Sequence, residues 1–462
     1  MVLAAGRGVR MRSEKPKVLH EVAGRPILDR VLDVARQLAG DESRIVVVVG
    51  AGREQVAARV AQVAPGARVA VQEPPRGTGD AVRCALPSLG GGGDVVILSG
   101  DAPLMRAATL GPLLEQRRGE VAVAFLTALL PDGGSYGRVV RDATGAVLKN
   151  VEAVDADEAQ LAIREVNAGF YVFERRFLEE ELPRLTAGNA KGEYYLTDLL
   201  GSAVAAGRKL VGIAAADADD ISGVNSRAEL ARADAVLRRR AAEAALAGGA
   251  TLIRPETITL DDTVVLEPDT VVEPFATLRG QTIVGSGTRI GQGSVIADSV
   301  FGRGALVKPY CVIDGARVGD GAIVGPFARL REGTELAEGV HVGNFVETKK
   351  ARLGRGVKAN HLTYLGDTVI GERTNVGAGV ITCNYDGFAK HETVVGADVF
   401  VGSDVQLVAP VTVGDGAIIG AGTTVTRDVP GNAITTARAP QVNREGMAEG
   451  YRAKKRGVPK AR

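Results

Sequence analysis

The feature that most constrains this chain is a six-residue period of apolar side chains in its second half. The period begins at residues 284, 290 and 296 and continues, with some steps of five, to residue 425. Of 22 positions in this series, 14 are followed directly by Gly, although Gly makes up only 60 of the 462 residues. Short parallel strands wound around a prism repeat in this way, with the apolar side chain inside and small residues at the turns. A β-sandwich would space its strands by about 8–12 residues, so we expect a parallel β-helix over 250–436.

The first half of the chain has a different pattern, in which short apolar runs alternate with amphipathic stretches. A helix is predicted at 25–39, and buried strands are predicted at 44–51, 67–73, 94–101 and 120–128. This alternation is typical of a doubly wound α/β sheet, which we place at 1–224. An Ala- and Arg-rich helix at 225–249, ended by a Gly pair, would connect the two domains. A basic tail occupies 437–462.

Composition excludes several classes of protein. The formal net charge of +1 argues against a nucleic-acid partner. Three widely separated cysteines, Cys84, Cys311 and Cys383, give neither a disulfide framework nor a zinc motif and fit a reducing, cytoplasmic setting. The chain has no apolar run approaching the ~18 residues of a membrane span, and its first residues do not resemble a signal peptide. We therefore expect small-molecule partners and no membrane insertion.

The opening stretch LAAGRGVRM (3–11), followed by PKVL (16–19), predicts a strand, a Gly-rich turn and two nearby cations, Arg10 and Lys17. Backbone N–H groups in such a turn can hold phosphate oxygens, and the cations can neutralise a triphosphate. The third Gly of a dinucleotide-binding fingerprint is absent, and so is the P-loop pattern. The stretch therefore predicts a phosphate site that follows neither of these two motifs.

At this point the residues carry a resemblance. The opening stretch is similar to that of nucleotide-sugar pyrophosphorylases, and LSGDAPL (98–104), YGR (136–138), VNAG (166–169), EYYLTD (193–198) and GVN (223–225) follow in the same order. The chain as a whole resembles the bifunctional uridylyltransferase/acetyltransferases that make UDP-N-acetylglucosamine. This resemblance implies a left-handed β-helix, UTP and acetyl-CoA as substrates, Mg²⁺ as cofactor, and a homotrimer with acetyl-transfer sites between subunits.

The resemblance assigns roles in the first domain. Arg10 and Lys17 would act on the triphosphate, while Asp101 and Asn225 would hold Mg²⁺. Nucleotide contacts would come from Leu3, Ala4, Ala5, Gly6, Gln72, Gly77 and Thr78, and N-acetylglucosamine 1-phosphate would be held by Gly137, Glu152 and Asn167. Asp101 suits its role because it follows a buried run, and ligands of open α/β sheets sit beyond the carboxyl ends of the strands.

In the second domain, His361 lies in NHLTYLGD (360–367), close to Glu347 in sequence. An imidazole suits a general base for acetyl transfer, and Glu347 would either orient it or pair with it for structure alone. The resemblance implies that glucosamine 1-phosphate is bound by Arg331, Lys349, Tyr364, Asn375 and Lys390. It implies acetyl-CoA contacts from Asn384, Tyr385, Ser403, Ala421 and Arg438. Asn384 and Tyr385 lie in a segment, 381–394, that interrupts the six-residue period. The basic end, 451–462, is either a solvated tail or a clamp on the phosphates of CoA.

Three features depart from the family pattern. Val9 replaces a small hydroxyl residue, Ser99 replaces a frequent Tyr, and the apolar run before LAAG is short, which suggests a start codon upstream of Met1. Two other functions stay open: another sugar-1-phosphate nucleotidyltransferase, and a non-catalytic regulatory subunit with the same two domains. The first would not need NHLTYLGD or TCNYDG (382–387), and the second would not need to retain the catalytic residues.

Overall fold

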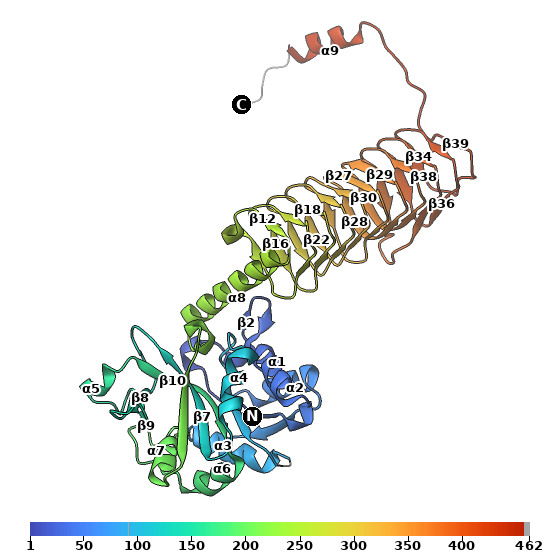
Figure 1. Ribbon diagram of the computed structural model, residues 1–462. Coiled ribbons are helices and arrows are strands. Elements are labelled where there is room, and N and C mark those ends of the chain that lie inside the picture. Colours follow the sequence, from blue (N-terminus) through green and yellow to red (C-terminus); the bar gives the residue numbers. More distant parts are fainter. Residues whose placement is uncertain (91, 457–462) are drawn as a thin grey trace. The chain divides into compact units, whose positions relative to one another are not determined.

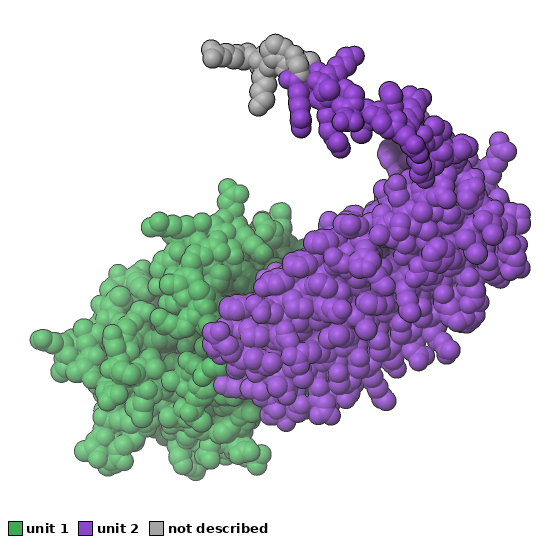
Figure 2. Space-filling model, turned by 90° about the horizontal axis from the view of Figure 1, so that it is seen from above, with its two compact units in different colours: residues 1–241 green, residues 242–462 purple. Residues whose placement is uncertain are grey.

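The computed structural model describes residues 1–90 and 92–456. The chain divides into two compact units, residues 1–241 and 242–462 (Figure 2). Helix α8 (Arg227–Ala247) contains the point of division. Across the described residues, no helix combines the length and apolar character needed to cross a bilayer.

The first unit is built on a nine-stranded mixed sheet (Figure 1). Along its main path the strands are β11 (Lys209–Ala214), β7 (Val121–Leu129), β10 (Glu165–Phe173), β6 (Val95–Ser99), β1 (Val2–Ala4), β4 (Val46–Val49) and β5 (Arg68–Val71), and β8 (Arg138–Arg141) and β9 (Val147–Val151) lie off it. Strands β4, β5, β6 and β7 match the four predicted runs. Strand β10 was not predicted; it runs antiparallel to β6 and β7.

Helices cover both faces of this sheet, as a doubly wound fold requires. They are α1 (Ile27–Ala39), α2 (Arg53–Val63), α3 (Thr78–Ala85), α4 (Ala107–Gln116), α6 (Arg175–Glu181) and α7 (Asp198–Ala205), whereas the short helix α5 (Glu158–Leu161) has no buried residue and lies beside β8. The run VVVV in β4 follows from this layering, because Val46 and Val48 enter one core while Val47 and Val49 enter the other. A strand buried on both faces needs no polar alternation.

The second unit is a parallel β-helix, from β12 (Thr251–Leu252) to β39 (Ile434–Thr435), with strands in an 11-stranded and a 17-stranded sheet (Figure 1). Successive coils stack in register, so that Val307 pairs with Val324, and Val324 with Val342. All three side chains are fully buried. The predicted six-residue period is therefore the inward face of this helix. Beyond it, α9 (Met447–Arg456) is basic and exposed, and residues 457–462 of the predicted tail lie outside the described part.

One corner of the β-helix carries exposed apolar side chains on several coils. We call Phe275, Tyr310, Phe327, Phe345 and Leu362 the apolar corner. Each sits where the chain passes from the 11-stranded to the 17-stranded sheet, with φ between 47° and 62°. The rings of Tyr310, Phe327 and Phe345 stack with centroids 5.5 and 5.4 Å apart. About half of each side chain in the corner is exposed within one subunit.

Candidate functional site

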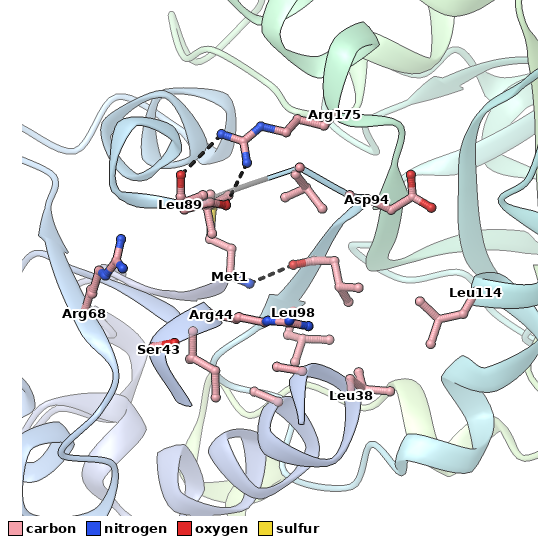
Figure 3. A pocket seen from close by; sticks show the side chains of 18 residues that line it. Met1, Leu38, Ser43, Arg44, Arg68, Leu89, Asp94, Leu98, Leu114 and Arg175 are labelled. Carbon is pink, nitrogen blue, oxygen red and sulfur yellow. Dashed lines mark hydrogen bonds between the residues drawn. The ribbon is translucent and has the colours of Figure 1, made fainter. Parts of the chain in front are cut away.

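Two hollows in the first unit lie at opposite ends of its sheet. A cavity of about 610 Å³ adjoins the amino ends of β1 and β6 and is lined by residues including Met1, Arg44, Arg68 and Arg175 (Figure 3). It contains none of the residues predicted to bind substrate. A cavity of about 340 Å³ adjoins the carboxyl end of β6 and contains Thr78, Asp101, Gly137, Glu152, Asn167 and Asn225. Ligands of open α/β sheets bind at the carboxyl ends, so the smaller cavity is the candidate site.

Three predicted residues meet at one edge of the smaller cavity. The Lys17 Nζ donates hydrogen bonds to Asp101 Oδ2 at 2.5 Å and to Asn225 Oδ1 at 2.8 Å. Asp101 follows β6 after one Gly, and Asn225 precedes α8, where its backbone N–H donates to Glu229 Oε2 at 2.8 Å. A carboxylate and an amide oxygen thus already face a common positive charge. These are hard oxygen ligands of the kind that Mg²⁺ takes, so the donor set fits that ion.

The Gly-rich turn allows Lys17 to reach this position. Gly8 has φ +60°, and a Cβ on it would lie 2.7 Å from the Lys17 Cβ. Only Gly combines that conformation with such a close approach. Leu3 and Ala4 end β1, and Ala5 and Gly6 follow it. Arg10 is exposed in a single 3-10 turn, and Val9, one of the departures from the family pattern, is 78% exposed.

Gln72, Gly77 and Thr78 form a second group, at the end of β5 and the start of α3. Gln72 Nε2 donates to Gly77 O at 2.9 Å and to Asp80 Oδ2 at 3.0 Å. Thr78 Oγ1 accepts a hydrogen bond from Leu196 N at 3.1 Å. Gly77 has φ +103°, and a Cβ there would lie 2.6 Å from the Tyr194 carbonyl oxygen, so no other residue fits.

The remaining polar groups of the cavity are held by their neighbours. Glu152 Oε1 accepts from Thr197 Oγ1 and from Asn150 Nδ2, both at 3.0 Å. Asn167 Nδ2 donates to the Tyr171 hydroxyl at 2.8 Å. The Ser99 hydroxyl donates to Gly169 O at 3.3 Å, so it is used within the protein. These contacts fix Glu152 and Asn167 before any ligand arrives.

In the β-helix, three predicted cations lie close together on the 17-stranded sheet and the loop beside it. Lys390 lowers the pKa of Lys349 through a hydrogen bond and through its charge, and Arg331 adds to this effect. The Arg331 Nη1 donates to Glu347 Oε1 at 2.9 Å. Tyr364 begins β30 (Tyr364–Ile370), next to β28 (Glu347–Leu353). Converging cations of this kind attract a phosphate group.

His361 ends β29 (Lys358–His361) on the 11-stranded sheet, where its Nδ1 lies 3.0 Å from the Asn344 Oδ1. Asn344 ends the neighbouring strand β27 (His341–Asn344) and is the register partner of His361. The expected partner was Glu347, which pairs with Arg331 instead. Because an amide oxygen can only accept, this contact favours the neutral tautomer with the proton on Nδ1 and a lone pair on Nε2.

The predicted acetyl-CoA residues occupy the last coils and the loop after β32 (Ile381–Cys383). Asn384 is buried and donates to Asp367 Oδ2 at 2.5 Å, whereas Tyr385 is exposed and donates to Gly387 O at 2.6 Å. The Arg438 Nη1 donates to Ala421 O at 2.6 Å, which brings these two predicted residues together. Ser403 lies after β34 (Phe400–Val401). This strand pairs with β31 (Asn375–Val376), which begins at Asn375, a residue predicted to bind the sugar phosphate.

Comparison with known proteins covers both units. Residues 1–170 match the model of the MobA-like NTP transferase domain, and residues 392–427 match that of the bacterial transferase hexapeptide (six repeats). The chain is 46% identical to the bifunctional protein GlmU of Cupriavidus pinatubonensis, over 96% of each chain. It is 48% identical to that of Trichlorobacter lovleyi, over 96% of this chain and 97% of the relative, and 47% identical to that of Sorangium cellulosum, over 100% and 98%. The chain belongs to the GlmU family.

Membership of the GlmU family accounts for both units at once. A nucleotidyltransferase without the second activity would not be expected to match GlmU proteins through the β-helix as well. Several residues that line the smaller cavity were not assigned from the sequence: Ser135, Tyr136, Lys191, Tyr195, Thr197 and Glu229. Two of them lie in EYYLTD, a segment that carried the family resemblance without assigned roles. Burial raises the pKa of Tyr195 to about 12, so its hydroxyl stays protonated and can donate.

Asn344 was also not assigned from the sequence, although its spacing from His361 indicates that the two residues are neighbours. His361 is 17 residues after Asn344, which is one coil of the β-helix, whereas Glu347 is only 14 residues before His361. Residues one coil apart pair side by side, and residues 14 apart do not. The coil length alone therefore identifies the neighbour of His361.

Proposed function

We propose that this chain makes UDP-N-acetylglucosamine in two steps. The second unit transfers an acetyl group from acetyl-CoA to the amine of glucosamine 1-phosphate, and the first unit joins the product to UTP with release of pyrophosphate. The observation that carries this proposal is the likeness to bifunctional GlmU proteins over nearly the full length of both chains. The two clusters of polar groups, one in each unit, provide the sites.

In the first unit, the phosphate oxygen of N-acetylglucosamine 1-phosphate attacks the α-phosphorus of UTP, and the bond to pyrophosphate breaks. Arg10 and Lys17 neutralise the triphosphate. The nucleotide is held by the backbone from Leu3 to Gly6 and by Gln72, Gly77 and Thr78. Gly137, Glu152 and Asn167 bind the sugar. Such a transfer needs mainly alignment and charge stabilisation, and the preset hydrogen bonds of Glu152 and Asn167 favour alignment.

Asp101 and Asn225 are the residues that would hold Mg²⁺, because their oxygens already converge on one cation. The bound ion would neutralise negative charge on the phosphates and on the departing pyrophosphate. Glu229 supports Asn225 by accepting from its backbone N–H.

In the second unit, the sugar amine attacks the thioester carbonyl carbon, and the thiolate of CoA leaves. The His361 Nε2 takes the amine proton, because Nδ1 is engaged by Asn344. Arg331, Lys349 and Lys390 bind the sugar phosphate with Tyr364 and Asn375. Asn384, Tyr385, Ser403, Ala421 and Arg438 bind acetyl-CoA.

We further propose that the protein is a homotrimer. His361 lies on the 11-stranded sheet, while Arg331 and Lys349 lie on or beside the 17-stranded sheet, and the apolar corner separates the two faces. Association through the apolar corner would bury its exposed rings and bring the His361 face of one copy toward the cationic face of the next. Burial of apolar surface is the usual driving force for such contacts.

The functional boundaries we propose are a uridylyltransferase domain at 1–224, a connecting helix at 225–249, an acetyltransferase domain at 250–436 and a basic tail at 437–462. The cytoplasm is the expected location, since Cys84, Cys311 and Cys383 are free thiols. Whether the tail clamps CoA stays a prediction, because 457–462 lie outside the described residues.

The test is an assay of both half-reactions on the full chain. With glucosamine 1-phosphate, acetyl-CoA, UTP and Mg²⁺, we expect release of free CoA thiol, release of pyrophosphate and formation of UDP-N-acetylglucosamine. In separate assays, with N-acetylglucosamine 1-phosphate supplied directly for the uridylyl step, Asp101→Ala should abolish pyrophosphate release only, and His361→Ala should abolish thiol release only. Failure of folded protein in both half-reactions would overturn the proposal, and loss of both activities from either folded variant would contradict two separate sites.

A further inference from the structure

The buried carboxylate of Asp80, which was not among the predicted site residues, holds the side chain of Gln72 in place. Asp80 lies on α3 and is 1% exposed. Its Oδ1 accepts from the Arg76 Nη2 at 3.2 Å, and its Oδ2 accepts from Gln72 Nε2 at 3.0 Å. Gln72 Nε2 also donates to the Gly77 carbonyl oxygen at 2.9 Å. Both N–H bonds of the Gln72 amide are therefore used inside the protein.

These contacts fix the direction of the amide. A flipped Gln72 would turn its oxygen toward the Gly77 carbonyl oxygen and the Asp80 carboxylate, and both of these groups only accept hydrogen bonds. In the observed direction, Gln72 Oε1 has no hydrogen bond to another group in the described residues, and it is not sealed from solvent. Gln72 thus presents an acceptor, and no donor, to a ligand.

We propose that Asp80 is a positioning residue for base selection. This proposal rests on the function proposed above. By holding the Gln72 amide, Asp80 leaves Oε1 to accept a hydrogen bond from the N3–H of a uracil ring. Cytosine has a lone pair at N3, so the same oxygen would face a second acceptor. A site with a fixed polar group discriminates in this way because the wrong partner leaves that group unpaired and repelled. The class selected is a pyrimidine with a donor at N3.

The test compares UTP with CTP in the pyrophosphate-release assay with N-acetylglucosamine 1-phosphate and Mg²⁺. The readout is the ratio of kcat/KM for UTP to kcat/KM for CTP. Asp80→Asn should lower this ratio at least about tenfold, since it replaces a charged acceptor with an amide that can also donate. The loss should appear mainly in KM for UTP, with kcat little changed, because Asp80 contacts Gln72 and Arg76 and does not line the cavity that contains Asp101 and Glu152.

Asp220→Asn is the matched control. Asp220 is a fully buried carboxylate of the same unit, paired with Arg106 at 3.0 Å and Arg240 at 2.7 Å. Its loss should lower the melting temperature without moving the UTP-to-CTP ratio. An unchanged ratio in folded Asp80→Asn, or an equal fall in Asp220→Asn, would overturn the role of Asp80.

A second measurement uses the wild-type protein and so does not depend on the folding of a variant. N3-methyl-UTP lacks the donor at N3, and its kcat/KM should be at least about tenfold below that of UTP. Equal use of the two nucleotides would overturn the inference. Absence of pyrophosphate release from wild type with every nucleotide would overturn the proposed function as well, and this distinguishes the two failures.

Discussion

At the scale of single residues, the candidate sites depend on side chains whose partners are already in place. Lys17 is buried against Asp101 and Asn225, Glu152 is fixed by Thr197 and Asn150, and Nδ1 of His361 faces Asn344. Preset contacts of this kind lower the cost of organising a site when ligand binds.

Lys17→Met should change both catalysis and metal affinity. Loss of its ammonium leaves the Asp101 carboxylate without a positive partner, so we expect about tenfold tighter binding of Mn²⁺ in the absence of nucleotide, together with a fall in uridylyl transfer of about 10²-fold or more. Electron paramagnetic resonance of Mn²⁺ measures the first effect. Lys15→Met removes the same charge from a surface ion pair with Glu21 and is the control; equal effects of the two variants would contradict the prediction.

Asn344 should set the pH dependence of acetyl transfer. Asn344→Ala removes the acceptor at His361 Nδ1 and should lower kcat/KM about tenfold. Asn344→Asp places a carboxylate there, which favours the imidazolium, so the acid limb of the pH profile should move to higher pH. Release of CoA thiol followed across pH measures both effects. Uridylyl transfer in the same variants should not change, and an unmoved acid limb in Asn344→Asp would count against the assigned geometry.

His20 predicts a pH-dependent stability of the first unit. Burial, followed by the charge of Arg227, lowers the pKa of His20 below its ordinary value of 6.5. The unfolded chain therefore binds a proton at a pH where the native state does not, and stability that is complete above about pH 6.5 is lost as pH falls through the native pKa. Urea midpoints at pH 7.5 and 5.5 should differ less in His20→Gln than in wild type; an equal difference would refute this.

At the scale of helices and strands, much of the fold could be predicted because apolar residues recur along the sequence in the patterns that buried strands and β-helix coils require. The run VVVV in β4 predicted a strand buried on both faces, and the apolar period with its following Gly residues predicted the β-helix. Strand β10 escaped prediction because Asn167 and Gly169 interrupt its apolar run, where its pairing with β7 shifts register. The contact of Asp80 with Gln72 was missed for a different reason: the turn at Gly77 brings together two nearby residues whose spacing indicates no contact.

The coils of the β-helix allow a paired test of the inward register. Ile419 is fully buried, whereas its neighbour Ile418 in β37 (Ile418–Ile419) is 43% exposed within one subunit. Ile419→Ala should cost about 2–5 kcal/mol in the free energy of unfolding, because it removes buried surface and leaves a cavity. Ile418→Ala should cost less than about 1 kcal/mol. Denaturant unfolding of each variant measures these values, and similar costs would contradict the register.

At the scale of the whole molecule, the two activities should differ in their need for assembly. The smaller cavity is lined entirely by residues of the first unit, whereas the proposed acetyl-transfer site needs two faces that one β-helix turns in different directions. Uridylyl transfer should therefore survive in a single subunit, and acetyl transfer should not.

Phe327→Glu tests this difference. A carboxylate in the middle of the apolar corner should separate the subunits, because burying a charge against stacked rings is costly. We expect the mass measured by light scattering to fall from three copies to one, acetyl transfer to fall at least about tenfold, and uridylyl transfer to persist. Ile283→Glu, which changes an apolar residue with 41% exposure away from the corner, is the control. Intact trimers in Phe327→Glu would show that the corner is not the contact.

The register of the β-helix has a consequence for how such a chain can change in length. Many strands pair with one 17 or 18 residues later, as Val307 does with Val324 and Val324 with Val342, whereas Val376 pairs with Val401 across a longer coil that carries the 381–394 segment. Removal of one complete coil from the start of the helix would leave every remaining pair and both proposed acetyl-transfer faces aligned. Removal of half a coil between residues 344 and 361 would instead place His361 on a different face from Asn344. The second unit therefore keeps its strand register when whole coils are gained or lost, or when the added residues form a loop between strands, as they do between β32 and β33 (Thr393–Val395).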